Sequence, residues 1–149
     1  MPGGRRHRAR VAALQSLYEA DSSTHEPHTA LDRIAAEHRL PQEAKEFARG
    51  LIERVLAEQD ELDALIGKAA PAWPVEQLSP VDRNILRLAI CEMLGDNGAP
   101  VRAVINEAVE LAKSFGSESS ARFINGVLGS IERQRNELIA GRPASKGGE

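Results

Sequence analysis

The sequence predicts an all-α fold of about six or seven helices packed into one domain. Apolar residues recur at three- and four-residue spacings along most of the 149 residues, as amphipathic helices require. No stretch of useful length alternates apolar and polar residues as a half-buried strand does. Only five residues are aromatic, so the 42% hydrophobic content rests mainly on aliphatic side chains, which suit packing of helix on helix.

Three helices are expected in the first half of the chain, at residues 6–20, 28–39 and 41–66. The polar residues between the first two helices indicate a loop. Pro41 suits the first position of the third helix, where its missing N–H costs nothing. That helix is long, with an apolar stripe on one side and charges on the other, so we expect one buried face.

The second half begins with an interruption at residues 71–74 and a short turn at residues 75–78. The clearest helix start of the chain follows. Ser79 can cap the helix, Pro80 suits its first position, and Asp82 favours the positive end of the helix dipole. Because this helix is apolar around nearly its whole circumference, we expect it to be central and buried.

Two further helices are expected towards the C-terminus. The first opens at Pro100, carries an inward-facing stripe that includes Phe115, and ends at Gly116. Ser117 can cap the second, whose inward-facing stripe extends to Ile131. The composition of residues 139–149 predicts a disordered tail.

Positive charge is concentrated at the N-terminus. Residues 1–10 hold four of the 19 basic residues and no acidic residue. The rest of the chain holds 15 basic and 22 acidic residues, so its formal net charge is −7, compared with −3 for the whole chain. The asymmetry predicts a basic arm, residues 1–10, leading into a helical domain at residues 5–138. On a helix Arg6 and Arg10 share a face, whereas Arg8 points roughly the other way.

Such an arm suits contact with RNA, because the planar guanidinium of arginine pairs with phosphate and also stacks on bases. The candidate RNA-contacting residues of the first helix are Arg5, Arg6, His7, Arg8, Arg10, Gln15 and Tyr18. Two simpler interpretations stay open: a solvated terminus, and Tyr18 as an ordinary core aromatic. Three or four phosphate contacts would give a log–log salt slope of about −2 to −3, so a partner or a second contact surface is expected to help.

Other classes of function find little support. Cys91 is the only cysteine, which rules out an intrachain disulfide and fits a reducing cytosol. The sequence has no run of about 18 apolar residues and no signal-peptide core, so we expect a cytoplasmic protein without a membrane span. Glu107, Glu110 and Lys113 predict a solvated ion-pair row rather than catalytic carboxylates. We expect no enzyme, cofactor, metal or small-molecule substrate.

Four segments together resemble the NusB family. The first is the arginine-rich opening that ends in Gln-Ser-Leu-Tyr, at residues 6–18. The second reads VDRNILRLAICE at residues 81–92, the third includes INEAVELAKSFG within residues 100–116, and the fourth reads FINGVL at residues 123–128. Their order and spacing match the family over about residues 5–133.

The resemblance implies two stacked helical bundles and a transcription antitermination factor. Such a factor binds the single-stranded boxA element of nascent ribosomal RNA together with the ribosomal protein NusE, in an elongation complex with RNA polymerase. The resemblance adds Arg122 and Phe123 to the candidate RNA-contacting residues. The NusE-contacting residues that it implies are Trp73, Leu78, Asp82, Arg83 and Arg87.

The sequence departs from the family pattern at His7, Cys91, Ser119 and Gly129. His7 stands where arginine is common, so its contact is expected to be weaker or to depend on pH. Ser119 stands at an often acidic position near the implied RNA surface, where the loss of charge would ease repulsion.

Gly126 is unusual because a glycine inside a helix costs about 1 kcal/mol relative to alanine. Tight packing of two helices is the simpler explanation. The alternative is that Phe123, one turn earlier, is partly exposed and stacks on a base.

Two other functions are kept as alternatives. One is a helical protein–protein interaction module with incidental RNA affinity, which salt-dependent binding of boxA-like RNA would distinguish. The other is a detached regulatory domain of an RNA methyltransferase system, because some of these enzymes carry a NusB-like N-terminal domain.

Overall fold

The computed structural model describes residues 3–95 and 97–141, and in this part of the chain every regular element is a helix. The elements are α1 (Gly3–Ser22), α2 (Pro27–Glu37), α3 (Gln42–Ala69), the short 3-10 helix η1 (Val75–Gln77), α4 (Pro80–Leu94), α5 (Val101–Phe115), α6 (Ser120–Arg133) and α7 (Arg135–Ala140). The predicted all-α class is confirmed.

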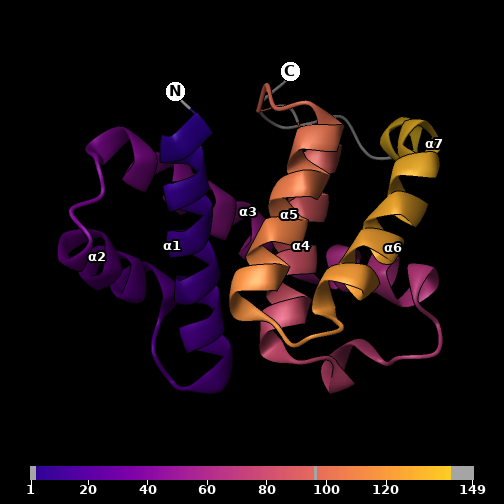
Figure 1. The fold of residues 1–149 in the computed structure, drawn as a ribbon, viewed down its shortest axis with the longest axis horizontal. Helices are drawn as coiled ribbons and strands as arrows, with labels where there is room; N and C mark the ends of the chain where they lie inside the picture. The colour runs from indigo at the N-terminus through magenta and orange to yellow at the C-terminus, as the bar shows by residue number, and fades with distance from the viewer. Residues whose placement is uncertain (1–2, 96, 142–149) are drawn as a thin grey trace.

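The helices form two bundles side by side (Figure 1). In the N-terminal bundle α1, α2 and α3 pack on one another, and in the C-terminal bundle α4, α5 and α6 do so, with α7 against α4 and α6. The two bundles join where α4 packs against α1 and α3. Of the 15 residues of α4, 11 are buried, so the predicted central helix is confirmed.

The start of α4 also follows the prediction. The side-chain oxygen of Ser79 accepts a hydrogen bond from the backbone N–H of Asp82 at 3.1 Å, and Pro80 occupies the first turn. This cap fixes the direction in which α4 leaves the preceding segment.

Several predicted helix ends were wrong by one to three residues, and some helices are capped by other residues than predicted. Helix α1 begins at Gly3 rather than at residue 6, so the basic arm is already helical. Pro41 and Pro100 are N-cap residues just outside α3 and α5. Gly116 ends α5 with an extended backbone. Ser117 does not cap α6: its backbone N–H donates to Oγ of the buried Ser120 at 2.9 Å.

The predicted tail began too early, because α7 includes Ile139 and Ala140. Residues 142–149, the rest of that predicted tail, lie outside the described residues. Among the described helices, none combines the length and apolar character needed to cross a bilayer.

Candidate nucleic-acid interface

The basic residues of α1 differ sharply in exposure. Arg5, His7 and Arg8 are exposed, Arg6 is half-buried, and Arg10 is buried. Arg5 lies 3.8 Å from a carboxylate oxygen of Glu43, a weak exposed pair.

His7 and Arg8 reach in different directions from α1. Nδ1 of His7 lies 2.5 Å from a carboxylate oxygen of Glu107 on α5. Arg8 donates to the backbone oxygen of His38 at 2.8 Å, after the end of α2. Both contacts are on the surface, so an incoming phosphate can compete for these side chains.

Arg10 cannot act as a free cation, and this corrects its assignment as a direct RNA contact. Its guanidinium donates two hydrogen bonds to the carboxylate of Glu92, at 2.8 and 2.7 Å, with only 10% of its side chain and 2% of that of Glu92 exposed. Burial by itself lowers the pKa of Arg10, but the hydrogen bonds and charge of Glu92, with the charge of Glu107, outweigh it and raise the pKa above its usual value. The positive charge of Arg10 is neutralised inside the protein.

Arg6 is intermediate between the exposed side chains of α1 and the buried Arg10. It donates to the backbone oxygen of Asn97 at 3.1 Å and stacks over the ring of Phe47, with 5.0 Å from its guanidinium carbon to the ring centre. The guanidinium of Arg10 lies over the same ring at 5.7 Å. The predicted shared face of Arg6 and Arg10 is therefore confirmed, and it faces Phe47, whereas Arg8 reaches towards α2.

A groove adjoins the basic residues of α1. Its larger part, about 700 Å³, lies between α1 and α2 and includes Gln15 and Tyr18; a smaller hollow of about 240 Å³ includes His7 and Arg8. Gln15 lines both parts, as do Ile34 and His38 of the α2 side. Tyr18 is 44% exposed, so its interpretation as a core aromatic is wrong.

Phe115 was predicted to face inward, but it is 39% exposed and lines the larger part of the groove together with Tyr18. The apolar spacing of α5 places Phe115 in the buried stripe, but Phe115 is the last residue of α5 and its ring stays partly exposed. Arg33 of α2 and Val81 of α4 also line this part. Val81 and Phe115 lie in the motifs of residues 81–92 and 100–116, but sequence alone did not place Phe115, Arg33 and Val81 in one groove, because the packing of four helices brings them together.

A separate patch lies on α6. Arg122 is exposed and Phe123 is half-buried, with part of its ring against the core. A Cβ atom built at Gly126 would meet nothing within 4 Å, so tight helix packing does not explain this glycine. The alternative, an open surface beside Phe123, fits the structure.

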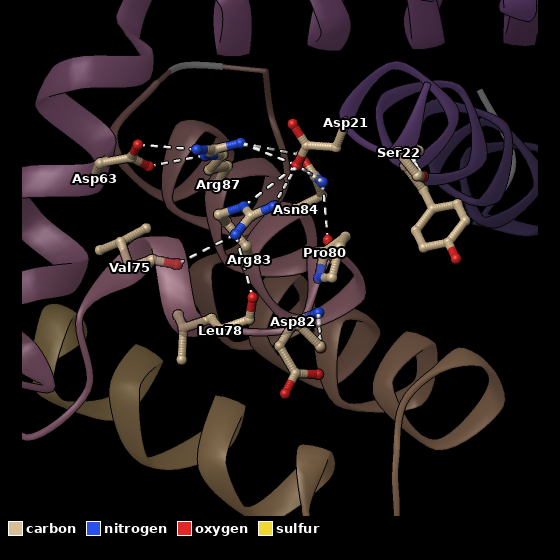
Figure 2. A network of polar contacts seen from close by, with 12 residues as sticks. Asp21, Ser22, Asp63, Val75, Leu78, Pro80, Asp82, Arg83, Asn84 and Arg87 are labelled. Atoms are coloured by element: carbon tan, nitrogen blue, oxygen red, sulfur yellow. Dashed lines mark hydrogen bonds and ion pairs between the residues drawn. The ribbon is translucent and has the colours of Figure 1, made fainter. Parts of the chain in front are cut away.

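The segment around residues 73–87 divides into exposed and internal side chains. Trp73 is 57% exposed, Leu78 is half-buried, and Asp82 points away from the polar network beside it (Figure 2). One carboxylate oxygen of Asp82 is shielded from solvent and has no hydrogen-bond partner among the described residues. Arg83 and Arg87, predicted as partner contacts, have side chains only 13% and 6% exposed and belong to the network.

The surface row predicted for Glu107, Glu110 and Lys113 is present only in part. Lys113 pairs with Glu110 at 3.3 Å, as the predicted surface row requires, but Glu107 turns to His7 instead. No group of three or more potential metal ligands occurs in residues 3–95 and 97–141.

Exposed cations and two exposed aromatic rings along one groove are features of helical RNA-binding proteins, and the fold and these surfaces place the chain in that class. The NusB family model matches residues 7–133. The chain therefore belongs to the NusB family, as its four motifs suggested.

Proteins of known name support the same family. The chain is 52% identical to the transcription antitermination protein NusB of Dehalococcoides mccartyi (strain CBDB1) over 128 residues, which cover 86% of this chain and 90% of the relative. It is 46% identical to the protein of the same name from Herpetosiphon aurantiacus over 132 residues, covering 87% and 90%.

Solved structures agree. NusB of T. maritima superposes with a TM-score of 0.81 at 34% identity, over 90% of this chain and 92% of that one. A chain in the structure of antitermination factors NusB and NusE in complex with dsRNA gives a TM-score of 0.80 at 27% identity, over 89% and 98%.

Proposed function

We propose that the protein is a transcription antitermination factor that binds boxA-type RNA of nascent ribosomal transcripts together with the ribosomal protein NusE. Its family membership supports this function, since close relatives carry the name transcription antitermination protein. A structural relative is described in complex with both NusE and RNA. The protein acts by binding within the elongation complex of RNA polymerase, in the cytoplasm and without catalysis.

The observation that carries the proposal is the groove of α1. Exposed cations at its narrow end can pair with phosphates, and the rings of Tyr18 and Phe115 at its wide end can stack on bases or receive a partner side chain. We define the RNA surface as Arg5, Arg6, His7, Arg8, Gln15 and Tyr18 of α1, with Arg122 and Phe123 of α6. Arg10 supports this surface from the interior.

We define the partner surface as Trp73, Leu78 and Asp82. The large exposed ring of Trp73 and the negative charge of Asp82 suit a protein partner that offers an apolar pocket and a cation. Val81, next to Asp82, lines the same groove as Tyr18, so the two surfaces adjoin.

The alternatives are less well supported. An interaction module with incidental RNA affinity does not require exposed cations beside a groove with aromatic walls. The relatives matched over 90% of their own length are named as antitermination proteins rather than methyltransferases.

A mobility-shift titration tests the proposal, using boxA RNA and a scrambled RNA of the same composition, each with and without purified NusE. We expect salt-dependent binding of boxA that NusE strengthens at least tenfold, and weaker binding of the scrambled RNA. Equal affinity for both RNAs, or no effect of NusE, would contradict it.

A further inference from the structure

A polar network joins the end of α1 to the start of α4 (Figure 2). One carboxylate oxygen of Asp21 accepts hydrogen bonds from Nε and Nη2 of Arg83, at 3.2 and 3.0 Å, and from the side-chain amide of Asn84 at 2.8 Å. Nη1 of Arg87 lies 3.6 Å from the same oxygen. Asp21 is therefore the single acceptor on α1 on which three α4 side chains converge.

Arg83 extends the network to the partner surface. Its remaining nitrogen, Nη1, donates to the backbone oxygens of Val75 and Leu78, at 3.3 and 3.1 Å. These two oxygens belong to η1 and the residue that ends it. Arg83 thus holds α1 with one edge of its guanidinium and the segment before α4 with the other.

The segment at residues 70–79 has little regular structure of its own. It contains the three-residue helix η1 and three backbone hydrogen bonds, from Trp73 to Ala70 at 3.1 Å, from Gln77 to Pro74 at 2.9 Å and from Leu78 to Val75 at 3.1 Å. An isolated 3-10 turn of this length is marginal. The position of this segment therefore depends on contacts from outside it: Val75 is buried in the core, Leu78 packs against the core, and Arg83 makes the two hydrogen bonds to its backbone.

Charge balance makes Asp21 the critical member. Arg87 has its own partner, because Nε and Nη2 pair with Asp63 of α3 at 2.8 and 2.9 Å. Arg83 has an ion pair only with Asp21 among the pairs that the structure shows. Without Asp21 the mostly buried Arg83 would lose its counter-charge, and its guanidinium would gain by turning to solvent and releasing the two carbonyls.

We propose that Asp21 is a positioning residue that sets the partner surface: through Arg83 it fixes residues 70–79 against the end of α1, one turn beyond Tyr18. The inference rests on the proposed function, since it assumes that a protein partner binds this surface. Asp21 needs no contact with that partner. It acts by removing conformational freedom before binding, so its loss weakens the complex by the cost of ordering the segment.

The RNA surface provides an internal contrast. Asp21 lies 13 residues beyond Arg8, about 20 Å along the helix axis, so its replacement leaves the cations of α1 in place. RNA binding by the protein alone should therefore respond much less than NusE binding.

The test measures the Kd for NusE by calorimetry, well below the melting temperature, for the wild type and for Asp21→Ala, Asp21→Asn and Asp21→Glu. We expect about tenfold weaker binding for the Ala and Asn variants and less than about threefold for the Glu variant, which keeps the charge. RNA binding without NusE should change less than about twofold. Combining Asp21→Ala with Arg83→Gln should cost less than the sum of the two single effects.

Asp32→Ala is the matched control. Asp32 also pairs with two cations, Lys45 and Arg49 at 3.0 and 3.1 Å, but these ion pairs tie α2 to α3 and involve no residue of 70–79. It should leave the Kd for NusE unchanged. Unchanged NusE binding in Asp21→Ala, or a lower melting temperature with an unaltered Kd, would overturn the inference while the wild type still binds NusE; failure of the wild type itself would overturn the proposed function.

Discussion

Arg10 of α1 and Glu92 of α4 form a buried ion pair with two hydrogen bonds, 11 residues along α1 from Asp21, which pairs with Arg83 of α4. On the side of α1 that faces α4, the positive Arg10 therefore precedes the negative Asp21. On α4 the positive Arg83 likewise precedes the negative Glu92. The pairs therefore match only when the helices run antiparallel in this register. A parallel arrangement would bring like charges together.

Arg10→Gln should destabilise the fold. Removing one partner of a buried pair leaves the other charge uncompensated, which costs about 3–5 kcal/mol. We expect a loss of that order in the free energy of unfolding measured with urea. RNA affinity of the folded variant should fall less than about threefold, because Arg10 does not face solvent; a large drop in affinity with unchanged stability would contradict the interior role of Arg10.

Arg5→Gln combined with Arg8→Gln should weaken RNA binding and leave the stability of the fold nearly unchanged. Both side chains are exposed, and surface pairs such as Arg5–Glu43 contribute about 0–1 kcal/mol to stability. If each arginine meets one phosphate, the slope of log K against log salt should become shallower by about 1.4, at about 0.7 per contact on single-stranded RNA. Titrations at several salt concentrations measure this slope, and an unchanged slope would remove these residues from the RNA surface.

Sequence patterns predicted the local structure and missed contacts made between distant helices. The Ser79 cap depends on residues three positions apart, so it could be read directly from the chain. The burial of Arg10 depends on Glu92, 82 residues away, and nothing in residues 1–10 shows which face of the helix is buried. Charge density located the basic helix, but burial decides which of its arginines can meet RNA.

The same division applies to the aromatic residues. The spacing of apolar residues put Phe115 in the apolar stripe of α5. Such spacing identifies a helix face but does not show how far the neighbouring helices cover that face. Phe123 is half-buried, as one of the two interpretations of its motif expected. The glycine of that motif was assigned to tight packing, however, since sequence cannot distinguish a close neighbour from open space.

Phe123→Ala should weaken RNA binding without unfolding the protein. Stacking of one base on an aromatic ring is worth about 1–3 kcal/mol, or about 5- to 150-fold in affinity. A fully buried phenylalanine would cost about 3–5 kcal/mol of stability, and the half-buried ring of Phe123 should cost less. Ile139→Ala, at an exposed apolar side chain on α7, is the control and should change neither quantity. Full RNA affinity in the Phe123 variant would indicate a purely structural ring.

Asp32 should contribute to the loss of folding stability at low pH. Hydrogen bonds from Lys45, then from Arg49, lower the pKa of Asp32 below its usual value. A carboxyl whose pKa is lower in the folded state stabilises that state above the pKa of the unfolded chain, about 3.9, and loses this contribution as the pH falls through the lower folded value. Asp32→Asn should therefore flatten the decline of stability below about pH 4. Urea unfolding at a series of pH values measures it, and parallel curves for the two proteins would contradict the prediction.

Gly126→Ala separates the stability of α6 from its proposed contact with RNA. An added Cβ meets open space, so the variant should gain up to about 1 kcal/mol of stability from the better helix propensity of alanine. Gly67→Ala in α3 is a matched control, because a Cβ there also meets nothing within 4 Å and α3 lies outside the RNA surface. Both variants should melt at higher temperature. If an RNA strand passes close to the backbone beside Phe123, only Gly126→Ala should lose RNA affinity, by about threefold or more, since the methyl group occupies the space of the strand. Equal affinities in the two variants would show that the strand does not approach α6 at Gly126, and the RNA surface would then be confined to α1 and its groove.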